Sequence, residues 1–171
     1  MSRKSNSLSS IEYALLGFLF SGSCHGYELH KRITDPDGVG MIWGVKLSNM
    51  YALLTKLEHQ GLITGKLLPG DQRPARMEYS LTAAGKQLFE QWMFTLVNHP
   101  REFRQEFMVR MYFLSQYHPD LKLKVISDQL AECERWANAT REKETALTKT
   151  GSFQNIVHHF RLSQIQSMVD W

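Results

Sequence analysis

Apolar residues recur at helical spacing along most of the chain, and the breaks between these runs divide it into elements. In the first half the spacing predicts four helices, over about residues 10–20, 25–33, 48–60 and 82–97. Ser9 or Ser10 can cap the first helix, with Glu12 in the first turn, where the helix dipole favours an acid. Thr82 can cap the fourth.

A different pattern follows the third helix. This helix ends at Gly61, and the apolar run Leu62-Ile63 comes next without a linker. A turn rich in Gly, Pro and Arg occupies residues 69–76, and residues 78–81 then return toward Thr82. The order predicts a helix-turn-helix unit with a β wing, a shape that inserts one helix into the major groove of DNA.

The predicted third helix, together with the wing, has side chains suited to DNA. Its apolar positions repeat at helical spacing, which leaves a small, polar and basic face opposite them. The candidate base-reading residues on that face are Ser48, Asn49, Thr55 and Lys56. An ordinary solvated face would show the same pattern, so the helix alone leaves both interpretations open. The wing favours DNA, because Lys66, Arg73 and Arg76 suit phosphate or the minor groove.

The second half of the chain has helical patterns and no strand signal. After a break at Asn98-His99-Pro100, helices are predicted over about residues 101–117, 120–148 and 153–170. We therefore predict a mainly α fold with a small β-hairpin: a winged-helix DNA-binding domain at residues 1–99 and an all-helical dimerisation domain at 100–171. Three helices do not easily bury so many apolar residues, which favours a homodimer. The predicted interface residues are Trp92, Leu96, Phe107, Met111, Leu114, Trp136, Phe160 and Ile165.

Composition and charge narrow the class of protein. Hydrophobic residues make up 43% of the 171, which suits a packed core and argues against disorder. The net charge is +3, and residues 41–86 carry six Lys or Arg against three Asp or Glu, so the positive excess lies in the predicted DNA-binding segment. Cys24 and Cys133 have no metal or redox spacing and fit a reducing compartment. With no signal sequence and no apolar run long enough to span a bilayer, we expect a soluble cytoplasmic protein.

No residue pattern indicates catalysis or metal binding. His158-His159 and the other histidines lack the spacing to Cys or carboxylates that a metal site needs. Gly38, Gly40 and Gly44 are not followed by the Lys-Ser/Thr pair of a phosphate loop. No nucleophile is set beside a base and an orienting group. We expect no cofactor, no metal and no enzymatic activity.

Several motifs together resemble the PadR-type transcriptional regulators. Two of them stand near the start of the chain, Leu15-Leu16-Gly17-Phe18-Leu19 and His25-Gly26-Tyr27-Glu28-Leu29, followed by Lys31-Arg32-Ile33. Trp43, eight residues before Tyr51, precedes Leu54-x-x-Leu57-Glu58-x-x-Gly61-Leu62-Ile63 and Arg76-x-x-Tyr79-x-Leu81-Thr82-x-x-Gly85. These motifs cover about residues 13–90. The helical tail is more weakly similar to the longer branch of the family, which includes the virulence activator AphA.

The resemblance implies a winged-helix fold in which the recognition-helix tyrosine and the basic wing touch the DNA backbone. In this chain the matching residues are Tyr51, Arg73 and Arg76. Tyr51 also lies beside core positions, so a purely structural role stays open. The chain departs from the family where Lys46-Leu47-Ser48 replaces a Ser-Pro-Gly-type entry and where Ala52 replaces a common Pro. These departures concern the base contacts rather than the fold.

The preferred hypothesis is a homodimeric regulator that binds double-stranded DNA as a repressor. A small-molecule-sensing, multidrug-type regulator would add an effector site at the dimer interface, where Trp92 could stack a planar ligand; packing is the simpler role for this residue. A winged helix kept for protein contacts is the third possibility. It would lack the salt-dependent DNA binding that phosphate contacts produce.

Overall fold

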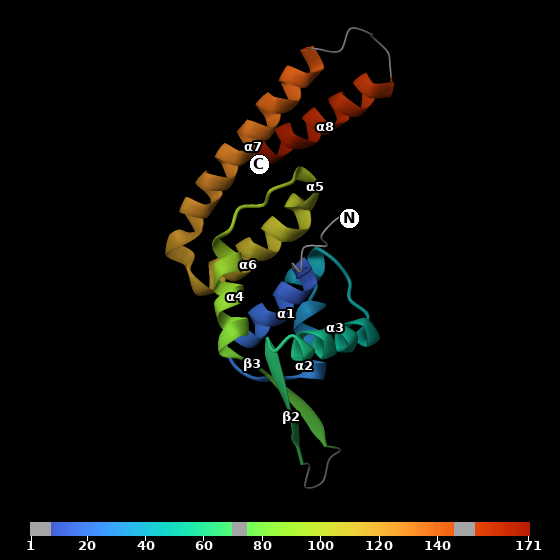
Figure 1. The fold of residues 1–171 in the computed structure, drawn as a ribbon, viewed down its shortest axis with the longest axis vertical. Helices are drawn as coiled ribbons and strands as arrows, with labels where there is room; N and C mark the ends of the chain where they lie inside the picture. Colours follow the sequence, from blue (N-terminus) through green and yellow to red (C-terminus); the bar gives the residue numbers. More distant parts are fainter. Residues whose placement is uncertain (1–7, 70–74, 146–152) are drawn as a thin grey trace.

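The computed structural model describes residues 8–69, 75–145 and 153–171, with only the backbone at 144–145 (Figure 1). The wing, β2 (Ile63–Leu68) and β3 (Arg76–Leu81), lies at one end of the long axis. The pair α7 (Lys122–Thr145) and α8 (Phe153–Asp170) lies at the other end. The fold is mainly helical with a small sheet, as predicted.

The remaining elements lie between these two ends. The winged-helix part contains α1 (Ser10–Phe20), β1 (Cys24–His25), α2 (Gly26–Ile33), a short 3-10 turn η1 (Val39–Met41), α3 (Leu47–His59) and α4 (Ala83–Phe94). The chain continues through α5 (Pro100–Glu102), a π-helical segment η2 (Phe103–Phe107), α6 (Met108–Tyr117) and a second 3-10 turn η3 (Pro119–Leu121).

Helix α1 begins with a capping box. The Ser9 hydroxyl accepts from the backbone N–H of Glu12 at 3.4 Å, and Oε2 of Glu12 accepts from the backbone N–H of Ser9 at 2.8 Å. These bonds satisfy two N–H groups that a helix start leaves without partners. Of the two predicted cap residues, Ser9 is the cap.

The end of α3 sets the direction of the wing. Gly61 has φ +70°, the left-handed conformation that glycine adopts without strain. Its N–H donates to the carbonyl of Glu58 at 2.9 Å, and the N–H of Leu62 donates to that of Leu57 at 3.0 Å. This pair of bonds is a Schellman motif, and it turns the chain straight from α3 into β2.

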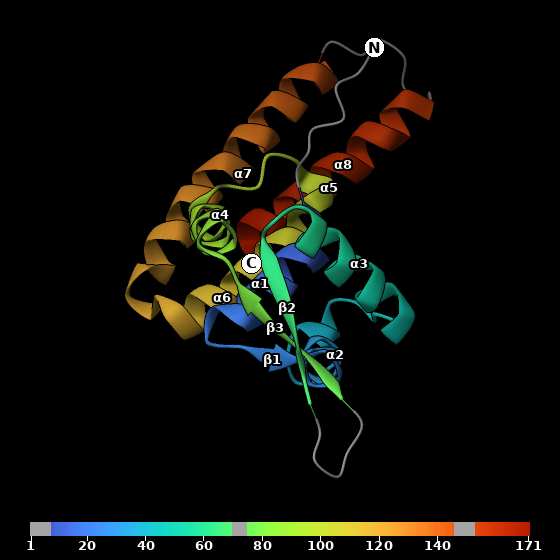
Figure 2. The ribbon, with the colours of Figure 1, turned by 60° about the horizontal axis from the view of Figure 1, so that its bottom comes forward.

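The wing belongs to a three-stranded antiparallel sheet of order β1-β3-β2 (Figure 2). Ile63 pairs with Leu81 and Leu68 with Arg76, while Cys24 of β1 pairs with Tyr79 on the other side of β3. Sequence reasoning predicted only the hairpin. Two residues are too few for a visible alternation, which is why β1 was missed.

The chain after residue 100 packs against the winged helix. Phe113 of α6 is fully buried and makes edge-on ring contacts with Phe18 of α1 and Phe89 of α4. The Tyr117 hydroxyl donates to the carbonyl of Gly17 at 2.9 Å. Helix α6 therefore shares the core of the N-terminal half. The division into domains at residues 99 and 100 stays a prediction.

Two helix boundaries differ from the predicted ones. Helix α4 ends at Phe94 rather than near Val97, because Thr95 adopts an extended conformation and its hydroxyl bonds the last-turn carbonyl of Trp92 at 2.9 Å. The predicted helix at 101–117 is broken by the π-helical segment Phe103–Phe107. This segment stacks Phe103 on Phe107, with ring centroids 4.7 Å apart.

Helices α7 and α8 lie side by side in both ribbon views and bury Cys133 and Ile165 between them and the rest of the chain (Figures 1 and 2). Gln129 of α7 is also buried. Its amide oxygen accepts from the N–H of Val97 at 2.7 Å and its amide nitrogen donates to the carbonyl of the same residue at 3.2 Å. This two-bond contact attaches the helical pair to the loop after α4. Within the described residues, no helix is both long and apolar enough to span a bilayer.

Candidate nucleic-acid interface

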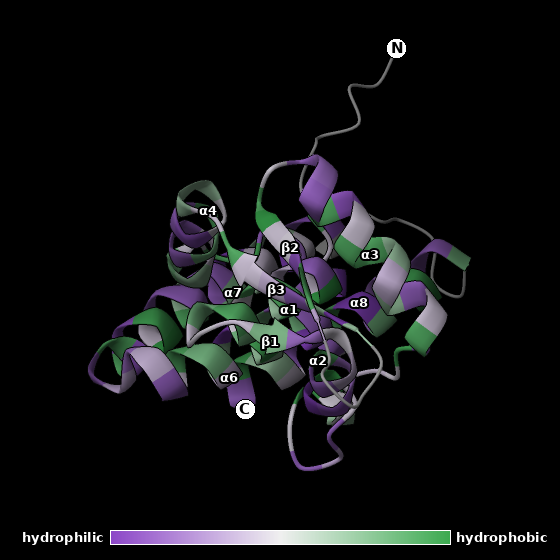
Figure 3. Cartoon of the chain, turned by 90° about the horizontal axis from the view of Figure 1, so that it is seen from below, coloured by the Kyte–Doolittle hydropathy of each residue, from purple (hydrophilic) through white to green (hydrophobic). Residues whose placement is uncertain are grey.

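Helix α3 is held by one buried face and presents the opposite face to solvent. Met50, Leu54 and Leu57 are completely buried, which fixes the rotation of the helix. Three of the four predicted base-reading residues, Ser48, Asn49 and Thr55, are exposed and directed away from the core. Seen from below, α2, α3 and the wing lie together on the near face of the molecule (Figure 3). This is the geometry that a helix needs to enter a major groove.

Tyr51 and Arg76 line one groove at the side of α3. The groove has a volume of about 630 Å³ and is also lined by His25, Gly26 and Tyr27. A Cβ atom on Gly26 would lie 2.8 Å from the Tyr51 hydroxyl, so only glycine allows the ring to lie against the start of α2. Tyr51 is 40% exposed. It therefore has a packing contact and still presents part of its ring beside Arg76.

The wing is attached to α3 by a carboxylate. Oε1 of Glu58 accepts from the backbone N–H of Gly65 in β2 at 2.8 Å. The Lys66 and Arg76 side chains are exposed on the two wing strands, and neither forms an ion pair with another residue of the described part. Arg73, the other predicted wing contact, lies outside the described residues.

Lys56 is placed differently from the other predicted base-reading residues. Its Nζ lies 2.6 Å from Oε1 of Glu12, whose side chain is 3% exposed. The other oxygen of this carboxylate accepts from the backbone N–H and the hydroxyl of Ser9, both at 2.8 Å. Lys56 is thus engaged by a buried acid of α1 in the DNA-free chain, a contact that the sequence did not predict.

The same contacts control the protonation of Glu12. Burial by itself raises the pKa of the Glu12 carboxyl, but the bonds from Lys56 and Ser9 outweigh it and hold the pKa below its ordinary value of 4.5. Because the folded pKa is depressed, this carboxylate stabilises the fold at pH values above the ordinary pKa. That stabilisation is lost as the pH falls through the folded value.

We therefore expect Glu12→Gln to remove a pH-dependent part of the stability. The free energy of unfolding of the wild type should exceed that of the variant at neutral pH, and the gap should narrow as the pH falls below about 4.5. Urea unfolding at a series of pH values measures this. Glu28→Gln removes an exposed carboxylate from an ion pair with Arg32 and is the matched control. A gap between wild type and Glu12→Gln that stays constant with pH would contradict the assignment.

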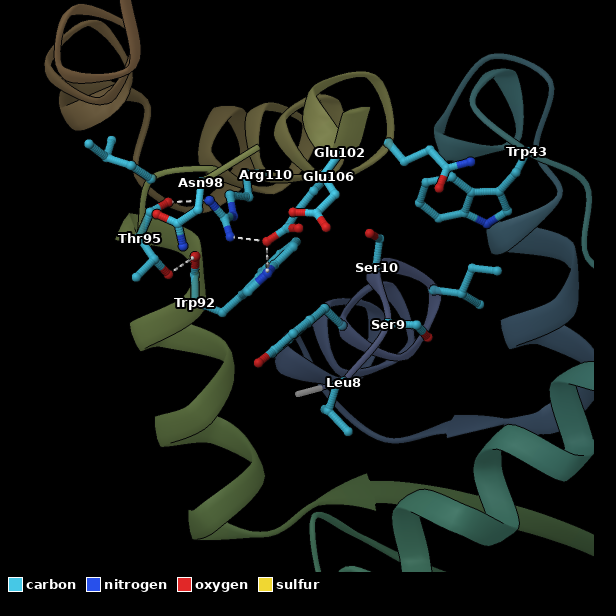
Figure 4. A pocket seen from close by; sticks show the side chains of 14 residues that line it. Leu8, Ser9, Ser10, Trp43, Trp92, Thr95, Asn98, Glu102, Glu106 and Arg110 are labelled. Carbon is cyan, nitrogen blue, oxygen red and sulfur yellow. Dashed lines mark hydrogen bonds and ion pairs between the residues drawn. The ribbon is translucent and has the colours of Figure 1, made fainter. Parts of the chain in front are cut away.

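A separate cavity of about 490 Å³ lies between α1, the end of α4 and the segment that leads into α6 (Figure 4). Trp92 lines it, stacked on Tyr13 with ring centroids 4.4 Å apart, and donates to Glu106 at 3.3 Å. Arg110 also lines it, almost fully buried, paired with Glu106 and 4.9 Å from the centre of the Trp92 ring. Burial lowers the pKa of Arg110, and the Glu106 carboxylate opposes this shift.

Two donors at this cavity have no hydrogen-bond partner among the described residues, Nε of Arg110 and the indole nitrogen of Trp43. Buried donors usually have partners, so an unsatisfied pair at one cavity marks a place where a polar ligand or water could bind. No group of three or more His, Cys, Asp or Glu that could hold a metal ion occurs in the described part of the chain.

The residues predicted at a dimer interface are mostly buried within one chain. Five of them are buried by the chain's own helices: Trp92, Phe107, Met111, Leu114 and Ile165. This differs from the expectation that a single copy would leave them exposed, because η2, α6 and α8 pack inward. Leu96 and Trp136 are half-buried. Phe160 alone among the eight is exposed, at 62%.

Phe153 and Ile156 share the exposed face of α8 with Phe160. These three side chains are 62–78% exposed and are spaced three and four residues apart. We call them the α8 stripe. The helical spacing of apolar residues was the available signal, but periodicity does not distinguish a face that packs within the chain from one that stays open.

Comparisons with known proteins agree with this architecture. Residues 15–91 match the model of the transcriptional regulator PadR-like family. This segment is therefore similar to members of the PadR-like family. The family consists of transcriptional regulators rather than enzymes. The PadR-like segment runs from α1 into α4 and contains the whole sheet, α2 and α3.

One named relative is the negative transcriptional regulator PadR of Bacillus subtilis (strain 168), which is 30% identical over 120 residues. The match covers 70% of this chain and spans 65% of the length of that regulator. The crystal structure of B. subtilis PadR in complex with operator DNA is 25% identical, with a TM-score of 0.50, and the alignment covers 95% of each chain. The crystal structure of B. subtilis PadR in complex with p-coumaric acid is 27% identical and has a TM-score of 0.44, with 95% of this chain and 90% of that chain covered.

Proposed function

We propose that the protein is a sequence-specific, DNA-binding repressor of transcription that acts in the cytoplasm as a homodimer. The observation that carries this proposal is the outward polar face of α3 beside a wing on which Lys66 and Arg76 are exposed and form no ion pair with any described residue. The alignment with an operator-bound PadR over 95% of both chains supports it, and the repressor role follows the negative regulator from B. subtilis.

Each part of this surface has a proposed role. Ser48, Asn49 and Thr55 read base edges, because their short polar side chains leave α3 on the exposed side. Tyr51, Lys66 and Arg76 contact the phosphate backbone from the groove and the wing. Arg73 is proposed to extend the wing contact, as the resemblance implies.

The homodimer is proposed to form through the α8 stripe. Three large apolar side chains on one exposed helix face leave an apolar surface in water, and a second copy would cover it. The pairing would use the long helices that follow the winged helix, which resemble the helical tail of the longer branch of the family, to which AphA belongs. Two winged helices are needed because one reads only a few base pairs.

A second candidate function, effector sensing, is favoured by the cavity beside Trp92. The unpartnered donors of Arg110 and Trp43, together with the stacked rings of Trp92 and Tyr13, suit a small planar anion. This position within one chain replaces the effector site that the sequence suggested at the dimer interface.

The salt dependence of binding to mixed-sequence duplex DNA tests the proposed function. We expect log K to fall linearly with log salt concentration, with a slope of about −0.9 for each phosphate contacted. A winged helix kept for protein contacts would show no such slope. Absence of salt-dependent binding by the folded protein would overturn the proposal.

A further inference from the structure

The contact between Glu12 and Lys56 has a consequence for DNA binding. We propose that Glu12 is a positioning residue that holds Lys56 away from DNA and so limits the phosphate contacts of α3. The inference rests on the proposed DNA-binding function and concerns the same surface. It replaces the base-reading role that the position of Lys56 on the polar face of the predicted helix suggested.

The burial of Glu12 explains why its carboxylate needs a counter-ion. Its side chain is 3% exposed, and a buried carboxylate without a counter-ion is costly. One of its oxygens is used by Ser9, which leaves the other for a cation. Among the described residues, Lys56 is the only Lys or Arg that forms an ion pair with it. Releasing Lys56 to a phosphate would therefore leave this charge buried without a counter-ion.

The position of Lys56 explains why its release would matter. It follows Asn49 by seven residues, so the two side chains leave α3 on nearly the same line along the helix. Asn49 is on the exposed face, whereas the Lys56 amine is directed to α1 from the edge of that face. The Lys56 side chain is still 51% exposed. A lysine freed at this edge has a flexible four-carbon stem with which to reach a phosphate.

The two wing cations differ from Lys56. Lys66 lies across the strands from Glu78, and neither Lys66 nor Arg76 forms an ion pair with a buried acid among the described residues, so both charges face solvent. Lys56, by comparison, is the counter-ion of the buried Glu12 carboxylate. Because Glu12 holds Lys56, this lysine does not add to the sequence-independent attraction between the protein and DNA phosphates. Weaker non-specific binding increases the share of the binding free energy that depends on the base contacts, and so increases sequence specificity.

Three variants test this arrangement on mixed-sequence duplex DNA: Glu12→Gln, Lys56→Met and the double variant. In Glu12→Gln, Lys56 should gain a phosphate, so the salt slope should steepen by about 0.9 per protomer. Between about 50 and 200 mM salt, that is an additional loss of affinity of about 3.5-fold per protomer. Lys56→Met should keep the wild-type slope. The double variant should match Lys56→Met, which shows that the gain comes from Lys56.

Ser9→Ala is the matched control, because it removes the cap hydroxyl and leaves the Glu12–Lys56 pair. It should keep the wild-type slope even if its melting temperature falls. A flattened slope in Lys56→Met, or an unchanged slope in folded Glu12→Gln, would overturn the proposal. If Glu12→Gln does not fold, the salt slope of Lys56→Met decides: a slope equal to that of the wild type supports the proposal, and a flatter slope overturns it. A wild type without any salt-dependent binding would instead overturn the proposed function.

Discussion

Replacing the α8 stripe with serine, as Phe153→Ser, Ile156→Ser and Phe160→Ser together, should convert the protein to a monomer and weaken operator binding by about 1,000-fold. The three side chains are 62–78% exposed, so their loss opens no core. A monomer presents one winged helix where specific affinity needs two half-sites. Specific binding typically exceeds non-specific binding by about 1,000-fold or more, and most of that difference should disappear.

Light scattering at micromolar concentration measures the assembly, and titration of operator DNA measures the affinity. Met41→Ser is the control, because Met41 is a similarly exposed apolar residue outside α7 and α8. That variant should keep the size and affinity of the wild type. A wild type that is already monomeric, or a triple variant that stays dimeric, would refute the proposed role of the α8 stripe.

Replacing both wing cations, as Lys66→Ala and Arg76→Ala, should weaken binding to every DNA sequence alike by about 100-fold at physiological salt. Both side chains are exposed and have no ion pair within the described residues, so little stability should be lost. Two contacts per protomer make four per dimer, and each should remove about 0.9 from the salt slope. Measuring affinity for operator and mixed-sequence duplexes across a salt series separates the two components.

Asn49→Ala is the comparison variant on α3. It should relax the preference for one base pair in each half-site, at a cost of about 1–3 kcal/mol per contact, and leave the salt slope unchanged. A change of sequence preference in the wing variant would contradict the assignment of the wing to phosphate contacts. An equal loss of affinity for all sequences in Asn49→Ala would contradict the assignment of Asn49 to base reading.

Local signals allowed the sequence to predict most elements of the fold. The Ser9 cap with Glu12 three residues later marks the start of α1, and Gly61 marks the end of α3. The apolar spacing on α3 correctly predicted that Met50 faces the core. These features depend on residues within about one or two helical turns of each other, which is the range over which sequence patterns are informative.

Contacts between residues far apart in the sequence could not be predicted from local patterns. Glu12 and Lys56 meet because α1 and α3 pack together, and nothing in either local pattern indicates the partner. Phe113 was predicted to belong to a separate domain, yet it shares a core with Phe18. Trp92 was predicted at a dimer interface, whereas its stacking on Tyr13 buries it within one chain. Periodicity shows that a face is apolar but does not show which surface covers it.

Genome-wide capture followed by footprinting would show whether two copies of this winged helix read one operator. Purified full-length protein is mixed with fragmented genomic DNA from the organism that encodes it. The bound fragments are then sequenced and footprinted. We expect a recurrent, two-fold-symmetric site with protected half-sites about 34 Å apart, or a multiple of one helical turn. Recovery of random fragments without a shared site, or protection of a single unpaired half-site, would contradict it.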